Sequence, residues 1–238
     1  MPPEALAARL RSEAAAVGVT LTESHTERLT RYLQLIQEWR SSARLTAVVD
    51  PLEAARVHIA DSLLLLRADL VDAAMLIDVG SGAGLPGIPL AIVRPDLRIT
   101  LLEAESRKAA FLEMAARELA LPIGVMVQRA EDAAHDPAAR ERFDIVAARA
   151  VAPMRVLLEL TLPFAAVGGL VVLLKGPSVR RELRAADRAN EVLGGGDMAL
   201  IEGRLAGGEI RRIVAVRKVS PTPAGFPRRA GVPARNPL

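Results

Sequence analysis

The sequence predicts an α/β fold with a largely parallel sheet that is covered by helices on both faces. From residue 76 onward, short apolar runs alternate with helix-compatible stretches, which is the pattern of parallel strands joined by crossover helices. The first run leads directly into the turn Gly80-Ser81-Gly82-Ala83-Gly84. A second apolar run ends in Glu103, 21 residues after Gly82. A glycine turn after one strand and an acidic residue at the end of the next are typical of sheets that bind nucleosides.

Seven strands and four intervening helices follow from the apolar pattern. The strands are expected at residues 76–80, 98–103, 123–127, 143–148, 168–174, 198–204 and 210–218. The helices are expected at residues 86–93, 106–119, 153–162 and 178–193. Only a short polar connection separates the last two strands, so the final strand should return antiparallel to its neighbour.

The chain divides into a helical N-terminal extension (1–72), a sheet domain (73–219) and a tail rich in proline and arginine (220–238). Apolar residues within 4–70 recur at helical spacing, and Asp50-Pro51 is a strong signal for a helix that runs to about Arg67. The tail has five prolines, three arginines and no acidic residue. We expect it to be extended, and either packed on the sheet domain or partly disordered.

Composition excludes several classes of protein. The 238 residues include no cysteine, which excludes disulfides, thiolate metal sites and a cysteine nucleophile. Charged residues interrupt every apolar run before the roughly 18 residues that a membrane helix needs. The N-terminus lacks the pattern of a signal peptide. We therefore expect a cytoplasmic protein with no membrane partner and no metal.

Basic charge is concentrated at the C-terminal end. Residues 178–238 hold 12 Arg or Lys against 6 Asp or Glu, whereas the whole chain has a net charge of only +3. Such a cluster is the first indication of a nucleic-acid partner. A solvated basic surface without a partner is the alternative on charge alone.

The glycine turn indicates which nucleoside is bound. Its spacing is G-x-G-x-G, whereas the dinucleotide fingerprint is G-x-G-x-x-G. Asp78 precedes the first glycine, where it would repel a pyrophosphate but attract an ammonium group. Glu103 can accept hydrogen bonds from a ribose diol. S-adenosylmethionine has both groups and no phosphate. A nicotinamide or flavin site, or a glycine turn without a ligand, remains an alternative.

From about residue 29 to its end, the chain resembles the bacterial small-subunit ribosomal RNA guanine-N7 methyltransferases, the glucose-inhibited division protein B family. The resemblance implies a Rossmann-like class I methyltransferase fold with seven strands. The family usually has Asn before Leu-Thr where this chain has Arg44, which puts the role of that Asn in doubt. The matching segments are residues 56–63, 78–89, 92–95, 129–131, 148–153, 174–176 and 227–238.

The resemblance also implies positions for the cofactor. In the family Gly80, Gly82 and Leu85 would form the floor under the methionine and ribose, and Glu103 with the adjacent Ala104 would hold the ribose. Ala130 and Glu131 would frame the adenine, and Arg149 would lie at the far side of the cofactor. Asp78, before the glycine turn, is a further candidate for cofactor binding. Glu131 could instead be a surface carboxylate at a helix start, and Arg149 a solvent-facing residue at a strand end.

Further residues are candidates for RNA binding and positioning. His58 and Asp61 lie on one helix face, where they would shape the RNA site or form a structural hydrogen bond to the sheet. Lys175 would contact a phosphate, or act as a structural cation. Arg228 and Arg229 would contact the RNA backbone, or belong to a packed structural tail.

The absence of two motifs narrows the choice of the atom that accepts the methyl group. Methylation of pyrimidine C5 generally requires a cysteine, and the chain also lacks the Asn/Asp-Pro-Pro-Tyr/Phe motif that grips exocyclic amines. Guanine N7 carries a free lone pair and needs alignment without a general base. The resemblance implies methylation of one guanine in 16S ribosomal RNA, near the decoding site, with the RNA or the small ribosomal subunit as the substrate. A non-catalytic RNA-binding assembly factor is the alternative, and a small-molecule methyltransferase is a weaker one.

Overall fold

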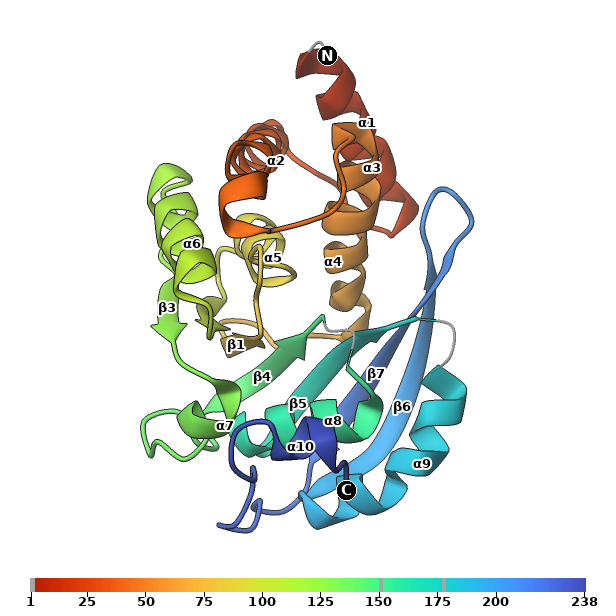
Figure 1. Cartoon of the computed structure of the whole chain (residues 1–238). Helices are drawn as coiled ribbons and strands as arrows, with labels where there is room; N and C mark the ends of the chain where they lie inside the picture. Colours follow the sequence, from red (N-terminus) through yellow and green to blue (C-terminus); the bar gives the residue numbers. More distant parts are fainter. Residues whose placement is uncertain (1–2, 150–151, 177–178) are drawn as a thin grey trace.

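The computed structural model describes residues 3–149, 152–176 and 179–238. At its centre lies one seven-stranded sheet with the order β3-β2-β1-β4-β5-β7-β6 (Figure 1). The strands are β1 (Met75–Val79), β2 (Arg98–Glu103), β3 (Gly124–Val127), β4 (Phe143–Ala148), β5 (Ala165–Lys175), β6 (Gly195–Arg204) and β7 (Ile210–Lys218). Strands β5 and β6 each begin three residues earlier than the apolar pattern indicates.

The sheet reverses direction at its end, as the sequence predicts. Strands β1 to β5 pair in parallel, whereas β7 is antiparallel to both β5 and β6. Strand β7 lies between β5 and β6. This is the expected seven-stranded, mostly parallel sheet, and the carboxyl ends of β1 to β5 therefore share one edge.

Helices cover both faces of the sheet (Figure 1). The N-terminal helical segments are α1 (Pro3–Ala16), α2 (Glu23–Ala43), α3 (Pro51–Ala54), the π-helix η1 (Ala55–Ala60), α4 (Asp61–Leu63) and the 3₁₀ helix η2 (Leu64–Ala68). The others are α5 (Gly87–Val93), α6 (Ser106–Glu118), α7 (Ala130–Ala133), α8 (Met154–Thr161), the 3₁₀ helix η3 (Leu162–Phe164), α9 (Val179–Val192) and α10 (Val232–Arg235). The short helix α7 was not among the predicted helices.

Alternating side chains of each strand feed two separate hydrophobic cores. In β4, Ile145 and Ala147 belong to the core under the N-terminal helices, whereas Val146 and Ala148 belong to the core under α8 and α9. Successive side chains of a strand point to opposite faces, so a sheet covered on both sides reads as a continuous apolar run. The N-terminal helices thus share a core with the sheet, because Leu33 and Ile36 of α2 belong to the same core as Ile145.

The segment after Asp50 departs from a regular α-helix. The Asp50 side chain caps the helix by accepting from the Leu52 backbone N–H at 3.1 Å, and helical structure continues to Ala68, close to the predicted end at Arg67. Between them, η1 is π-helical, and such wide turns occur often at functional sites. His58 lies in this π-helical turn.

Arg44 ends α2 in the left-handed conformation, with φ 49° and ψ 47°. Asparagine adopts this conformation more readily than other residues with a side chain. Arg44 therefore takes a backbone conformation that asparagine would adopt with less strain.

Candidate cofactor and RNA site

The glycine turn after β1 leaves open space above two of its glycines. Gly80, Gly82 and Gly84 all have positive φ, at 73°, 58° and 91°. A Cβ built on Gly80 would meet no atom within 4 Å, and one on Gly82 would meet only the Gly80 carbonyl oxygen, at 3.9 Å. A Cβ on Gly84 would lie 2.5 Å from Cδ1 of Ile88. Gly84 therefore serves packing, whereas Gly80 and Gly82 border space that a ligand can occupy.

Asp78 is a buried carboxylate, and only one of its two oxygens accepts a hydrogen bond from the residues that the structure describes. Its Oδ2 accepts the backbone N–H of Gly87 at 3.0 Å at the start of α5. Its Oδ1 is buried and has no hydrogen-bond partner in the part of the chain that the structure describes. Burial raises the pKa of Asp78 to about 7, against the opposing effect of the Gly87 N–H. Such an oxygen is suited to a cationic donor.

Glu103 joins the two turns at the ends of β1 and β2. Its Oε2 accepts the Gly82 backbone N–H at 2.9 Å, and its Oε1 accepts the Glu105 backbone N–H at 2.8 Å. A carboxylate offers about four acceptor positions, so each oxygen can accept a further donor such as a ribose hydroxyl. Ala104, which lies between Glu103 and Glu105 in the chain, is exposed. Leu85, next to the glycine turn, is buried in the core under the N-terminal helices.

Glu131 directs its carboxylate to the C-terminal tail. Its Oε1 accepts the Gly231 backbone N–H at 2.9 Å and lies 3.1 Å from Nη2 of Arg129. Burial alone would raise the pKa of Glu131, but these hydrogen bonds outweigh it and lower the pKa. Ala130, which begins α7 beside Glu131, is partly exposed. The tail therefore holds the start of α7, which follows the carboxyl end of β3.

Arg149, directly after β4, contacts the N-terminal helices. Its guanidinium lies 3.3 Å from the His58 carbonyl oxygen and 3.2 Å from Nδ1 of the His58 ring. Its Nε lies 3.7 Å from Oδ2 of Asp61, whose Oδ1 accepts from Arg211 at 2.8 Å. The structure thus brings the predicted residues His58, Asp61 and Arg149 together at the carboxyl edge of the sheet.

The hydrogen bonds around His58 define its protonation. Arginine can only donate, so Nδ1 of His58 accepts from Arg149, and the ring proton lies on Nε2, which is 2.9 Å from Oγ1 of Thr46. Burial and the neighbouring charge of Arg149 lower the pKa of His58 to about 4. Burial raises the pKa of Asp61, against the effects of Arg149 and Arg211. At neutral pH, His58 is therefore uncharged and both ring nitrogens have partners.

Lys175 and Arg228 are held in internal ion pairs. Lys175 Nζ lies 2.7 Å from Glu182 and donates to the Ala152 carbonyl at 2.8 Å, and the residue is only 8% exposed. Arg228 makes a two-pronged contact to the fully buried Glu159, at 2.9 and 2.6 Å. The Glu182 side chain is 25% exposed and follows Lys175 by seven residues, whereas Glu159 precedes Arg228 by 69 residues. Both contacts fit the structural alternatives that the sequence left open for these two cations, and RNA binding by either residue stays a prediction. Arg229 is exposed.

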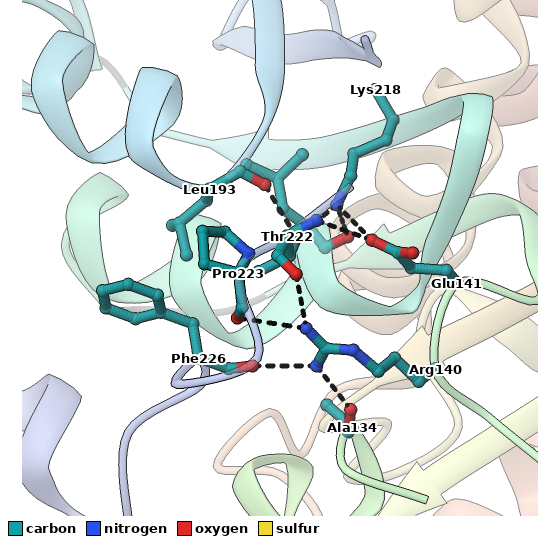
Figure 2. Close-up of polar contacts among 9 residues, drawn as sticks. Ala134, Arg140, Glu141, Leu193, Lys218, Thr222, Pro223 and Phe226 are labelled. Carbon is teal, nitrogen blue, oxygen red and sulfur yellow. Dashed lines mark hydrogen bonds and ion pairs between the residues drawn. The ribbon is translucent and has the colours of Figure 1, made fainter. Parts of the chain in front are cut away.

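Figure 2 shows how the tail is fastened to the domain. Arg140 donates to the carbonyls of Thr222, Pro223 and Phe226 in the tail and to that of Ala134, which ends α7. Glu141 pairs with Lys218 and accepts the Thr222 backbone N–H. The tail is therefore packed on the domain, which was one of the two expected outcomes.

Sequence reasoning missed several residues that shape the site. Tyr32 of α2 is fully buried and donates to the Ala83 carbonyl of the glycine turn at 2.6 Å. Thr46, Arg140 and Arg211 complete the contacts to His58, the tail and Asp61. Of these four residues, only Tyr32 could have been noticed in the sequence, as an isolated tyrosine within an apolar helical pattern. The contacts of the other three depend on the tertiary fold.

The described residues contain neither a membrane-spanning helix nor a cluster of metal ligands. No helix in residues 3–149, 152–176 and 179–238 combines the length and apolar character needed to cross a membrane. Within the same ranges, no group of three or more His, Asp or Glu side chains is placed to hold a metal ion.

Comparisons with known proteins give the family. Residues 25–205 match the family model of rRNA small subunit methyltransferase G. Among relatives, the ribosomal RNA small subunit methyltransferase G of Moorella thermoacetica is 43% identical over 93% of both chains, and that of Pelotomaculum thermopropionicum is 42% identical over 98% of this chain and 99% of its own. The solved structure of P. horikoshii TYW2 in complex with MeSAdo is 13% identical with a TM-score of 0.50, covering 64% of this chain and 60% of its own, which supports the fold alone. The chain belongs to the rRNA small subunit methyltransferase G family.

Proposed function

We propose that this protein transfers a methyl group from S-adenosylmethionine to N7 of a guanine in the RNA of the small ribosomal subunit. Family membership supports the reaction and the class of substrate. The cofactor assignment rests on the open space above Gly80 and Gly82, which Glu103 borders. Next to it lies the buried Oδ1 of Asp78, which has no hydrogen-bond partner among the residues that the structure describes.

The residues present fit this cofactor. The free Oδ1 of Asp78 would accept from the methionine ammonium group, and Glu103 would accept from the ribose hydroxyls. Gly80 and Gly82, with Leu85, would form the floor, and Ala104 and Ala130 would line the ribose and adenine ends. Because the tail occupies the Glu131 carboxylate, Glu131 would contribute by fixing the start of α7. When bound, the cofactor supplies an electrophilic methyl group on its sulfonium.

The electrostatics favour an acceptor atom that has no proton to lose. His58 is neutral and both its nitrogens are in hydrogen bonds, so it is not available as a general base at neutral pH. Guanine N7 needs only alignment with the methyl group and exclusion of water. Arg149 would border this region, held in place by His58 and Asp61.

The test is to incubate the protein with labelled S-adenosylmethionine and small-subunit RNA from a strain that lacks the activity. We expect one labelled guanine, at which the RNA is cleaved after reduction and aniline treatment. A labelled strand that resists this cleavage would contradict N7. RNA binding without label transfer would favour the alternative of a non-catalytic assembly factor.

A further inference from the structure

Helix α9 presents a row of arginines that have no partner among the residues that the structure describes. Arg181, Arg184 and Arg188 are exposed, and no hydrogen bond or ion pair joins them to any other residue that the structure describes. At 3.6 residues per turn, the three lie within about 60° of one another around the helix axis. We call Arg181, Arg184 and Arg188 the α9 arginine row.

The row faces away from the protein. The buried residues of α9 are Val179, Ala186, Ala189 and Asn190, which lie on the opposite side of the helix. Arg180 lies on the same side of the helix, about 40° from Arg184, but it is not counted in the row because it pairs with Glu202 of the neighbouring strand β6. The row therefore points into solvent, on the outer surface of the layer that α8 and α9 form on the sheet (Figure 1).

Nearby acidic residues do not neutralise the row. Glu182 is already bound to Lys175 and to the Met154 backbone N–H. Asp187 and Glu191 follow Arg184 and Arg188 by three residues, which is the weaker orientation for a helical ion pair, and the structure shows no such pair. Arg184 and Arg188 are four residues apart, a spacing at which like charges destabilise a helix. An external anion would remove this repulsion.

The row begins near the edge at which ligands bind. Helix α9 follows β5, and the Lys175–Glu182 pair ties its first turn to the carboxyl end of that strand. Ligands of open α/β sheets bind at these carboxyl ends. From Arg181 to Arg188 the helix rises about 10 Å, a length over which one strand of a duplex presents about three phosphates at ~3.4 Å each.

From this placement, we propose that the α9 arginine row binds the phosphate backbone of the RNA substrate beside the methylation site. The proposal rests on the proposed function, since it assigns a partner to the same edge of the sheet. The proposal also assigns the RNA contact that the basic charge of residues 178–238 indicates to α9. Arg228 within this segment, and Lys175 just before it, are instead paired internally. A long RNA can reach across several such contacts at once.

The test is the triple variant R181Q/R184Q/R188Q, in which glutamine preserves helix propensity and most of the side-chain stem. Its affinity for a 16S RNA transcript should depend less on salt, with the magnitude of the log–log slope reduced by about 2 for three lost contacts at ~0.7 each. Between 50 and 200 mM salt, the wild type should then lose about 16-fold more affinity than the variant. Its affinity for S-adenosylmethionine should match the wild type.

A matched control removes the same charge elsewhere. Arg98, Arg142 and Arg217 are exposed, lie at the opposite edge of the sheet and each contact one backbone carbonyl. The variant R98Q/R142Q/R217Q should keep the wild-type salt slope. An equal change in both variants would overturn the proposal, because the effect would then follow from net charge alone.

Two other results would also overturn it. One is an R181Q/R184Q/R188Q variant that binds the transcript with wild-type affinity and slope. Another is a variant that binds and methylates the transcript normally but fails on assembled subunits, which would assign the row to a ribosomal protein. Failure of the proposed function is distinguishable, since it would appear as an absence of methyl transfer by the wild type, whereas the slope comparison requires only RNA binding.

Discussion

Asp78 and Gly87 are joined by a buried hydrogen bond, in which Oδ2 of the carboxylate accepts the first backbone N–H of α5 at 3.0 Å. This contact fixes the carboxylate, while its Oδ1 has no hydrogen-bond partner in the described part of the chain. The side chain thus both secures the helix that follows the glycine turn and retains a buried acceptor for a ligand.

Affinity for S-adenosylmethionine should rise with pH around neutrality. The pKa of Asp78 is raised to about 7, so in the free protein the carboxylate is protonated below this pH and ionised above it. If the ammonium group binds the ionised form, affinity should increase about tenfold between pH 6 and pH 8. Asp78→Asn should bind weakly with a flat profile. Calorimetric titration across this range measures both, and a flat wild-type profile would contradict the role of Asp78.

The same pKa predicts the direction of a stability change. A carboxyl group whose folded-state pKa lies above its unfolded value of 3.8 stabilises the fold fully below pH 3.8, and this contribution is lost as pH rises through about 7. Asp78→Asn cannot ionise, and its melting temperature relative to the wild type should therefore be higher at pH 8 than at pH 5. A difference that is the same at both pH values would show that Asp78 does not titrate in this range.

Substitution of Gly82 and of Gly84, two glycines of the same turn, should affect different properties of the protein. Gly82→Ala places a Cβ in the open space, so it should weaken cofactor binding while the strain of positive φ lowers stability by only about 1 kcal/mol. Gly84→Ala has similar backbone strain but also brings its Cβ within 2.5 Å of Ile88, so it should lower the melting temperature more. Thermal melts and cofactor titrations of both variants measure these effects. If Gly82→Ala and Gly84→Ala lost the same cofactor affinity and the same stability, the result would argue against a ligand at Gly82.

The two adjacent arginines of the tail should differ sharply in their effect on stability. Arg228→Gln leaves the fully buried Glu159 without its cation, a change that costs about 3–5 kcal/mol in comparable buried pairs. Arg229→Gln, its exposed neighbour, should change stability by less than about 0.5 kcal/mol. Denaturant unfolding measures both. Similar values for the two variants would show that the Glu159 pair contributes little.

The rate of methyl transfer should be independent of His58 ionisation. With its pKa lowered to about 4, His58 is neutral from pH 6 to 9. Single-turnover rates at saturating cofactor should therefore be flat over this range, and His58→Asn should lower the rate without changing its pH profile. A wild-type rate that rises tenfold per pH unit below pH 7, and becomes flat in His58→Asn, would indicate general-base catalysis and an acceptor other than N7.

The apolar pattern predicted the sheet well because its central strands β1, β4, β5 and β7 are largely buried on both faces, whereas the edge strands β3 and β6 are only partly buried. The ends of β2, β4 and β7 agree with the predicted ranges, and the reversal of the last strands followed from the short connection between them. What could not be predicted depends on partners far away in the chain. Glu159 captures Arg228 across 69 residues, and no local signal marks that contact. The sequence shows Asp78 just before the glycine turn, but its bond to Gly87 depends on how α5 packs and could not be predicted.

The tail contact at Glu131 has a consequence for how the protein matures during synthesis. The partner of Glu131 is the backbone N–H of Gly231, 100 residues later in the chain. The sheet and glycine turn can emerge and begin to fold earlier, since domains fold as their residues leave the ribosome. The start of α7, however, is not fixed until the tail is released. A nascent chain therefore forms this contact only after residue 231 has left the ribosome, and a chain that stops before this residue retains the glycine turn without the contact.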